Sequence, residues 1–167
     1  MKNLYFLAIE GVIGAGKTSL ARLMAEKLNA RLVLEKFEEN PFLEDFYRDP
    51  ERYAFQAQLY FLLSRYRQQI ELKQIDLFTN LLISDYMFAK DKLFAILNLD
   101  EKELSLYNLV AQHLEKDLPK PDLVVYLQAS TDRLMANIKK RGRSYEKSIN
   151  RDYIDSLNQI YNEFFFR

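Results

Sequence analysis

The sequence predicts an α/β fold in which helices cover both faces of a parallel sheet. Short apolar runs alternate along the chain with longer segments whose apolar residues recur at helical spacing. A glycine-rich turn separates the first apolar run from the first of these segments, and only four glycines and four prolines leave little room for linkers. Strict alternation of this kind is typical of a parallel sheet with crossover helices. We therefore expect one domain over residues 1–167, with ligands bound at the carboxyl ends of the strands.

Periodicity places the individual elements. The four apolar runs predicted as strands are residues 4–9, 30–35, 81–85 and 123–127. Helices are predicted from about residue 17 to 28, and at 51–73, 100–118, 131–140 and 153–164. Pro41 and Pro50 bound a predicted connection at 40–49. Asp100 with Glu103 resembles a capping box, which marks the start of a helix.

Composition excludes several classes of function. Lys plus Arg equals Asp plus Glu, at 24 each, so no basic field points to a nucleic-acid polymer as partner. The absence of cysteine excludes disulfides and thiolate metal sites, and a single histidine excludes a mechanism that needs two. We see no secretory signal and no apolar run near the roughly 20 residues of a membrane span. A cytoplasmic protein with no membrane partner is expected.

The strongest motif is the segment Gly11–Thr18, GVIGAGKT, which fits the phosphate-binding pattern GxxxxGK[ST] between a predicted strand and a predicted helix. Its glycines let backbone N–H groups turn toward a phosphate, and the helix N-terminus adds about half a positive charge. Lys17 is expected to reach the β- and γ-phosphates, and the Thr18 hydroxyl to bind Mg²⁺. The sequence thus predicts an ATP- and Mg²⁺-dependent phosphotransferase of the P-loop class. The predicted ATP-binding residues are Gly11, Val12, Ile13, Gly14, Ala15, Gly16, Lys17 and Thr18.

Two carboxylates end predicted strands. Asp85 ends the third strand and should open onto the same edge of the sheet as the phosphate loop, where a carboxylate suits Mg²⁺. Glu35 ends the second strand, and a phosphoryl acceptor needs a nearby carboxylate to take its proton. Glu38 and Glu39 compete for that role, although position favours Glu35.

Two further groups of polar residues admit two interpretations each. Gln58 and Arg65 lie seven residues apart in the most apolar helix, so they share a face. They would either bind a ligand or serve as an internally bonded amide and a structural ion pair. Arg141, Arg143 and Glu146 form a charged turn. Its arginines would suit a transferring phosphoryl group, but composition alone favours a solvated helix end.

Together these features resemble the deoxynucleoside kinase family, and within it the bacterial deoxyadenosine/deoxyguanosine kinase branch, over nearly the whole chain. The resemblance implies a P-loop NTPase three-layer fold with a helical lid turn. It also implies ATP-dependent phosphorylation of the 5′-hydroxyl of a deoxynucleoside, with purines favoured, for nucleotide salvage by a homodimer. The segments that carry it are Glu10-Gly11, Glu35, residues 40–43, Tyr47 through 50–52 to Gln58, Ser64-Arg65, Asp85 through Lys90-Asp91, and Arg141-Gly142-Arg143 with Glu146.

The resemblance also implies roles near the acceptor base. Glu35 would be the general base for the 5′-hydroxyl. Gln58 would hydrogen-bond the edge of the base, and Arg65 would pair with Asp91 beside it. With Asp85, these residues would form most of the substrate site.

Other implied roles concern the sugar and the phosphates. Tyr47 and Glu146 would hold the 3′-hydroxyl of the sugar. Arg141 and Arg143 would be lid arginines over the phosphates. The resemblance therefore favours a functional charged turn over a solvated helix end.

The chain departs from the family pattern in two respects. Many members carry an arginine directly after the acidic residue that ends the third strand, and here that residue is Tyr86. The missing charge would come from Lys90, Lys92 or a lid arginine, or catalysis would be weaker. The family fold also implies a further strand and an adenine-contacting segment after the last helix. We therefore expect a domain shortened at its C-terminus, with four strands in place of five, and either a truncated sequence or impaired ATP binding.

Other functions stay open at this point. A nucleoside-monophosphate kinase such as thymidylate kinase would carry extra basic residues for the acceptor phosphate, whereas Gln58 and Arg65 suit a neutral base. A nucleotide-binding switch protein would not need Glu35 and would carry an Asn-Lys-x-Asp motif, which we do not find. A chain that binds nucleoside but turns over poorly is a further alternative.

Overall fold

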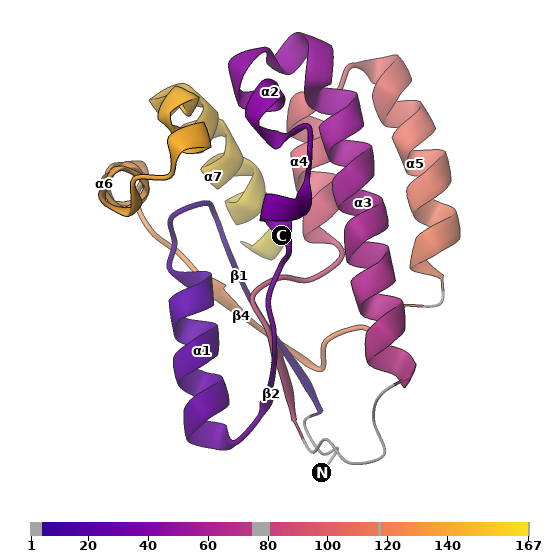
Figure 1. The fold of residues 1–167 in the computed structure, drawn as a ribbon, viewed down its shortest axis with the longest axis vertical. Coiled ribbons are helices and arrows are strands. Elements are labelled where there is room, and N and C mark those ends of the chain that lie inside the picture. The colour runs from indigo at the N-terminus through magenta and orange to yellow at the C-terminus, as the bar shows by residue number, and fades with distance from the viewer. Residues whose placement is uncertain (1–4, 75–80, 117, 167) are drawn as a thin grey trace.

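A parallel sheet lies at the centre of the structure, a computed structural model that describes residues 5–74, 81–116 and 118–166 (Figure 1). Within these residues the sheet has four strands in the order β2-β3-β1-β4. Their bounds are β1 Phe6–Gly11, β2 Arg31–Val33, β3 Leu82–Ser84 and β4 Leu123–Leu127. All three pairings are parallel, and Ala8 of β1 lies opposite both Ser84 and Val124. The predicted α/β architecture with a parallel sheet is confirmed.

Alternate residues of β1 are buried on opposite faces of the sheet. Leu7 and Ile9 pack with Ala21 and Ala25 of helix α1, which spans Lys17–Leu28. Phe6 and Ala8 instead belong to a cluster that reaches the long helix α3, Pro50–Gln74. Because both faces are covered, the four residues Phe6 to Ile9 are all apolar rather than alternating, as expected for a central parallel strand.

The other helices complete the layers around the sheet. Asp100 caps α5 by accepting hydrogen bonds from the backbone of Lys102 and Glu103, and Glu103 reciprocates, which confirms the predicted capping box. Ser130 caps α6, and Gly142 ends it in the left-handed conformation. No helix within the described ranges combines the length and the hydropathy that a membrane crossing requires. The bounds are α2 Leu43–Arg48, α4 Lys90–Asn98, α5 Glu101–Glu115, α6 Thr131–Arg141 and α7 Arg151–Phe166, with 3₁₀ turns at Phe37–Glu39 and Ser144–Ser148.

The structure corrects several element predictions. Residues 40–49 are not a plain connection, because they contain the short helix α2, in which Leu43 and Phe46 are buried. Phe46 packs with Ala54 and Ala57 of α3. Helix α4 was not predicted, since its first residues are charged and hide its apolar spacing. The first strand runs to Gly11 rather than ending at Ile9, and Leu4 lies outside the described residues.

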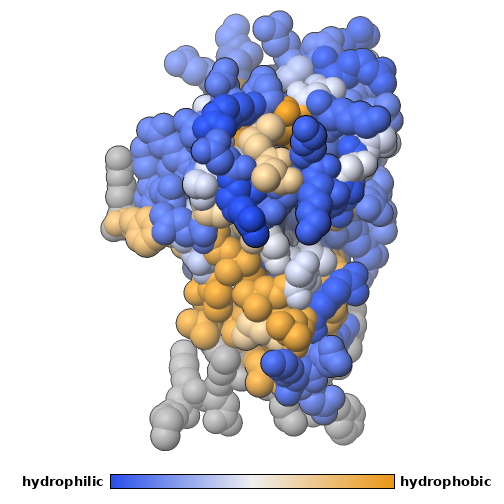
Figure 2. Space-filling model, turned by 90° about the vertical axis from the view of Figure 1, so that its left-hand side faces the viewer, coloured by the Kyte–Doolittle hydropathy of each residue, from blue (hydrophilic) through white to orange (hydrophobic). Residues whose placement is uncertain are grey.

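One face of the molecule carries an exposed apolar region (Figure 2). In the space-filling view, polar side chains cover the upper part, and an apolar region lies lower, at the level of β4 and α1 in Figure 1 (Figure 2). β4 is an edge strand of the described sheet, and its first residue, Leu123, is 46% exposed. The functional residues described below gather at the opposite end of the strands, where β1, β2 and β3 end.

Candidate active site

The glycine-rich turn after β1 forms a loop around the amino group of Lys17. The Lys17 Nζ atom donates to the carbonyl oxygens of Gly11 at 2.7 Å and of Val12 at 3.1 Å. Gly14 has φ +87°, and a Cβ atom there would meet the Leu134 carbonyl oxygen at 2.8 Å, so only glycine fits between the loop and α6. Burial and the nearby charge of Lys90 lower the pKa of Lys17 to about 8. The loop thus lies between β1 and α1, the strand and helix context that the motif requires.

Thr18 and Asp85 place two hard oxygen ligands at the mouth of this loop. The Thr18 hydroxyl donates to Asp85 Oδ2 at 2.5 Å, and Asp85 Oδ1 accepts from the Glu35 backbone N–H at 2.8 Å. Within the described residues, no three acidic, His or Cys side chains form a metal-binding cluster. Mg²⁺ commonly uses one or two protein oxygens together with phosphates and water, so this pair fits the predicted ion.

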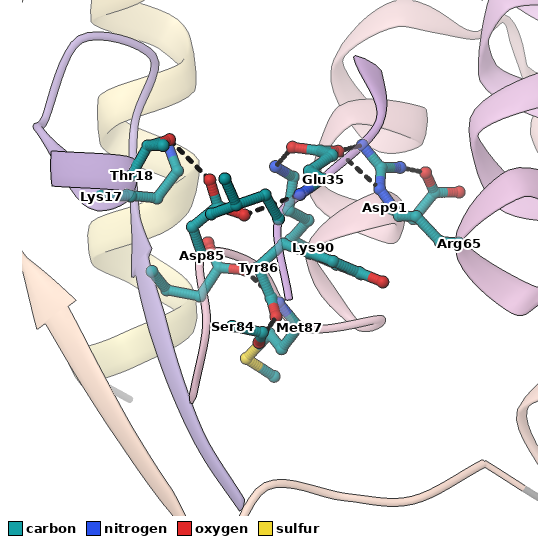
Figure 3. Close-up of polar contacts among 12 residues, drawn as sticks. Lys17, Thr18, Glu35, Arg65, Ser84, Asp85, Tyr86, Met87, Lys90 and Asp91 are labelled. Atoms are coloured by element: carbon teal, nitrogen blue, oxygen red, sulfur yellow. Dashed lines mark hydrogen bonds and ion pairs between the residues drawn. The ribbon is translucent and has the colours of Figure 1, made fainter. Parts of the chain in front are cut away.

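The Glu35 carboxylate is held between two cations (Figure 3). Its Oε1 atom accepts from Arg65 Nε at 2.8 Å and Nη2 at 2.5 Å, and its Oε2 atom accepts from Lys90 Nζ at 2.6 Å. Burial by itself would raise the pKa of Glu35, but the two cations outweigh it and hold the pKa well below its usual range. Glu35 is therefore an ionised carboxylate. Glu38 and Glu39 are exposed and lie outside the cavity that Glu35 lines.

Arg65 connects Glu35 to a second buried carboxylate. It forms the ion pair with Asp91 that the resemblance to the family implied, and Asp91 also accepts from the Tyr107 hydroxyl at 2.6 Å. The contact between Arg65 and Glu35 was not predicted. Asp91 is only 1% exposed, so its ion pair with Arg65 lies in the protein interior. Arg65 therefore serves as a structural partner of Asp91 and also contacts the ionised Glu35 carboxylate.

Gln58 shares the face of α3 that carries Arg65, as the seven-residue spacing predicted. Its side-chain Nε2 donates to the Asp91 carbonyl oxygen at 2.9 Å, so the amide is partly committed to the protein. Phe61 lies between the two along this face, and the Arg65 guanidinium lies 4.7 Å from the centroid of its ring. The side chains of this helix face thus combine a polar and an aromatic surface.

The charged turn after α6 folds onto Glu146. Both Arg141 and Arg143 pair with the Glu146 carboxylate, which is buried, and the Arg143 guanidinium lies 4.2 Å from the centroid of the Phe37 ring. The two arginine side chains are 35% and 30% exposed, so each is only partly solvated. This arrangement differs from a simple solvated helix end.

Tyr47 lies beside this turn. Its ring stacks on Tyr145, with ring centroids 6.4 Å apart and planes inclined by 12°. Burial, together with neighbouring tyrosines and Glu146, raises the pKa of Tyr47 well above its usual value. Its hydroxyl is therefore neutral and able to donate a hydrogen bond.

One cavity brings most of the predicted site residues together. Gly11, Val12, Ala15, Gly16 and Asp91 do not line it, because the first four form other parts of the loop and Asp91 lies behind Arg65. The predicted residues that do line it are Ile13, Gly14, Lys17, Thr18, Glu35, Tyr47, Gln58, Arg65, Asp85, Arg141, Arg143 and Glu146.

The cavity wall also contains residues that the sequence analysis missed. Ala54, Ala57 and Phe61 follow the spacing of Gln58 and Arg65 along α3, so helical periodicity was a signal for them. The others lie on separate elements far apart in the chain, and no local pattern marks them. These are Phe37, Leu43, Phe46, Phe94, Asn98, Tyr145 and Tyr153. Lys90, which also lines the cavity, was already a candidate for the missing charge.

Comparison with known proteins identifies the family. The family model for deoxynucleoside kinase matches residues 7–167. The chain belongs to the deoxynucleoside kinase family. It is 37% identical over 162 residues to the deoxyguanosine kinase of Bacillus subtilis (strain 168), covering 96% of this chain and 78% of that protein. It is also 37% identical to the deoxyadenosine kinase of Dictyostelium discoideum over 163 residues, covering 95% of this chain and 65% of that protein.

A solved structure agrees with this assignment. The deoxyadenosine kinase from M. mycoides with bound dATP superimposes with a TM-score of 0.87 at 31% identity, covering 98% of this chain and 84% of that chain. The predictions of a P-loop kinase fold and of a phosphotransferase that uses ATP to phosphorylate deoxynucleosides are confirmed. None of these three relatives favours the nucleoside-monophosphate kinase or the switch protein.

The buried ion pair between Arg65 and Asp91 predicts a stability effect in this deoxynucleoside kinase. Asp91→Ala leaves the Tyr107 hydroxyl and part of the Arg65 guanidinium buried without their acceptor. Breaking a buried pair in this way costs about 3–5 kcal/mol, so we expect a loss of that size in the free energy of unfolding measured with urea.

The matched control is the exposed pair of Asp45 and Arg48, whose side chains are 42% and 69% exposed. Asp45→Ala should cost no more than about 1 kcal/mol. If the Asp91→Ala variant unfolded with the same free energy as the Asp45→Ala variant, the stabilising role of the Arg65–Asp91 pair would be contradicted.

Proposed function

We propose that this deoxynucleoside kinase acts on the 5′-hydroxyl of purine deoxynucleosides, with Glu35 as the general base. The observation that carries the proposal is the position of the Glu35 carboxylate. It lies in the wall of a cavity lined by charged, polar and aromatic side chains, and its own backbone N–H donates to Asp85 at the mouth of the phosphate loop. An ionised carboxylate between an acceptor pocket and a phosphate site suits removal of the hydroxyl proton.

The cavity offers different surfaces for the base and for the sugar. Phe61 and Phe94 supply aromatic surface, and Gln58 presents an amide at the α3 side, which suits a planar base. Tyr47 and Glu146 lie on the α2 and lid side and suit the sugar 3′-hydroxyl. The deoxyguanosine and deoxyadenosine specificities in the names of the Bacillus and Dictyostelium relatives support a purine acceptor.

In the proposed reaction, the 5′-oxygen bonds to the γ-phosphorus of ATP while the bond from that phosphorus to the β–γ bridging oxygen breaks. Glu35 takes the 5′-hydroxyl proton, and ADP leaves with the electron pair of the broken bond. Lys17, Arg141 and Arg143 stabilise the charge on the phosphates. To do so, the two arginines would leave the Glu146 carboxylate and bond phosphate oxygens instead. Thr18 and Asp85 would hold Mg²⁺, which neutralises phosphate charge.

An acceptor that already carries a phosphate is not favoured by this arrangement. Arg65 and Lys90, the cations on the acceptor side of the cavity, are each paired with a buried carboxylate. A nucleoside monophosphate would have to compete for them. The Mg²⁺ requirement, the homodimer and the cytoplasmic location stay predictions.

The purine proposal is tested with the four deoxynucleosides. We expect kcat/KM for deoxyadenosine and deoxyguanosine at least equal to that for deoxycytidine and thymidine, because a purine covers more of the aromatic wall. Steady-state assays with ATP measure this ratio, and a strong thymidine preference would exclude the purine proposal. Matching assays with the four monophosphates test the alternative acceptor class.

Lys17→Ala tests the assignment of the phosphate loop. We expect turnover to fall by at least about 10³-fold, the effect seen when a phosphate-stabilising cation is lost in phosphoryl transfer. Deoxynucleoside binding, measured by calorimetry, should change little because Gln58 and Arg65 lie on another element. Lys27→Ala, an exposed lysine in the last turn of the same helix, is the control. Loss of nucleoside binding in a folded Lys17→Ala variant would count against two separate subsites.

Glu35→Gln tests the general base. A positioned base contributes about 10²–10⁴-fold, or about 3–5 kcal/mol of barrier, and glutamine keeps the size of the side chain but cannot take the proton at neutral pH. We expect kcat to fall by that factor with a much smaller change in KM, and toward the lower end if proton removal comes late.

Glu38→Gln and Glu39→Gln are matched controls, because both residues are exposed and lie outside the cavity. They should retain nearly all activity. If one of them lost activity while Glu35→Gln kept it, the base would be assigned to the wrong carboxylate, although the kinase activity would stand.

A further inference from the structure

Lys90 is a buried cation that meets Glu35 from the side opposite Arg65. It is the first residue of α4, its side chain is 6% exposed, and its Nζ atom lies 2.6 Å from Glu35 Oε2. The same atom lies 5.7 Å from the centroid of the Phe94 ring, one turn further along α4. Burial of an ammonium group is unfavourable unless the charge is paired, so Glu35 accounts for its position.

Tyr86 stands where many family members carry an arginine. Of the residues considered as sources of the missing charge, Lys90 is the one that bonds Glu35. Tyr86 is fully buried, points away from the Glu35 cluster in Figure 3, and donates its hydroxyl to Gln68 at 3.0 Å. Lys92 is exposed and does not line the cavity. The lid arginines Arg141 and Arg143 are paired with Glu146. Of Lys90 and Lys92, only Lys90 therefore lines the cavity and contacts Glu35.

The two cations hold different oxygens of the same carboxylate. Arg65 bonds Oε1 through two nitrogens, whereas Lys90 bonds Oε2. With Arg65 alone, the carboxylate could pivot about Oε1, and the second contact fixes its plane. We infer that Lys90 is a positioning residue, which orients the Glu35 carboxylate toward the acceptor hydroxyl. This inference rests on the proposed role of Glu35.

A cation beside a base has two opposing effects. It lowers the proton affinity of the carboxylate, which slows proton removal, and it fixes the geometry, which speeds the reaction. In a loose phosphoryl transfer the proton leaves late, so basicity carries less weight than position. Loss of Lys90 should therefore lower kcat.

The test compares Lys90→Met, which keeps the length and apolar character of the side chain without its charge, with Lys90→Arg. We expect kcat of Lys90→Met to fall about 10- to 100-fold, the range for losing a partner that orients a functional group. Binding of deoxyadenosine or deoxyguanosine by calorimetry should change less than threefold. Lys90→Arg should recover most of kcat. Lys92→Met, which removes an exposed charge from the same helical turn, should match the wild type.

A double variant shows whether Lys90 acts through Glu35. If it does, Lys90→Met combined with Glu35→Gln should be no slower than Glu35→Gln alone, because the group that Lys90 positions is already disabled. Losses that multiply in the double variant would overturn the inference. A wild-type kcat in Lys90→Met would overturn it as well.

A crystal structure of Lys90→Met gives a readout that does not depend on activity. Arg65 still pairs with Glu35 in this variant, so we expect it to fold, with the Glu35 carboxylate rotated about Oε1. A carboxylate in its original orientation would overturn the inference. If wild-type protein phosphorylated no deoxynucleoside, the proposed function would fail, while this structural comparison would still decide whether Lys90 orients Glu35.

Discussion

The Glu35 carboxylate between Arg65 and Lys90 is the interaction on which the arrangement of the site depends. It joins the end of β2 to α3 and α4, three elements far apart in the chain. With Asp91 included, the buried group holds two carboxylates and two cations, so its formal charges balance. An ion in such a place is tolerated only when its partners are present, and removing any one of the four leaves another uncompensated. The contacts with Arg65 and Lys90 that pair the Glu35 carboxylate also hold it in one orientation.

The phosphate loop is tied to this cluster through the edge of the sheet. Asp85 follows β3 and bonds both the Thr18 hydroxyl and the Glu35 backbone. Glu10, fully buried at the end of β1, accepts from the backbone N–H of Met87 at 2.7 Å and so holds the segment between β3 and α4 against the loop. Burial raises the pKa of Glu10, although the charges of Lys90 and Lys17 oppose that shift. The donor and acceptor subsites are therefore parts of one bonded framework.

The proposed base pocket offers few polar groups that are not already bonded within the protein. Relatives of this chain include kinases named for deoxyguanosine and for deoxyadenosine, and the M. mycoides deoxyadenosine kinase was solved with dATP and with dCTP. In this chain, Gln58 and Arg65 each bond to Asp91, so the polar groups nearest the proposed base position are partly committed. The aromatic and small residues of the wall are then left to discriminate by shape.

Local sequence patterns predicted the parallel α/β fold and the phosphate loop, and the resemblance to the family predicted the pairing of Arg65 with Asp91. Patterns over a few residues suffice for the first two, because apolar spacing and glycine placement act locally. The sequence did not reveal that Lys90 rather than Lys92 lines the cavity, that Arg65 also bonds Glu35, or that α2 and α4 form as helices. These outcomes depend on which side chains meet across elements distant in the chain, and neighbouring residues do not encode that geometry.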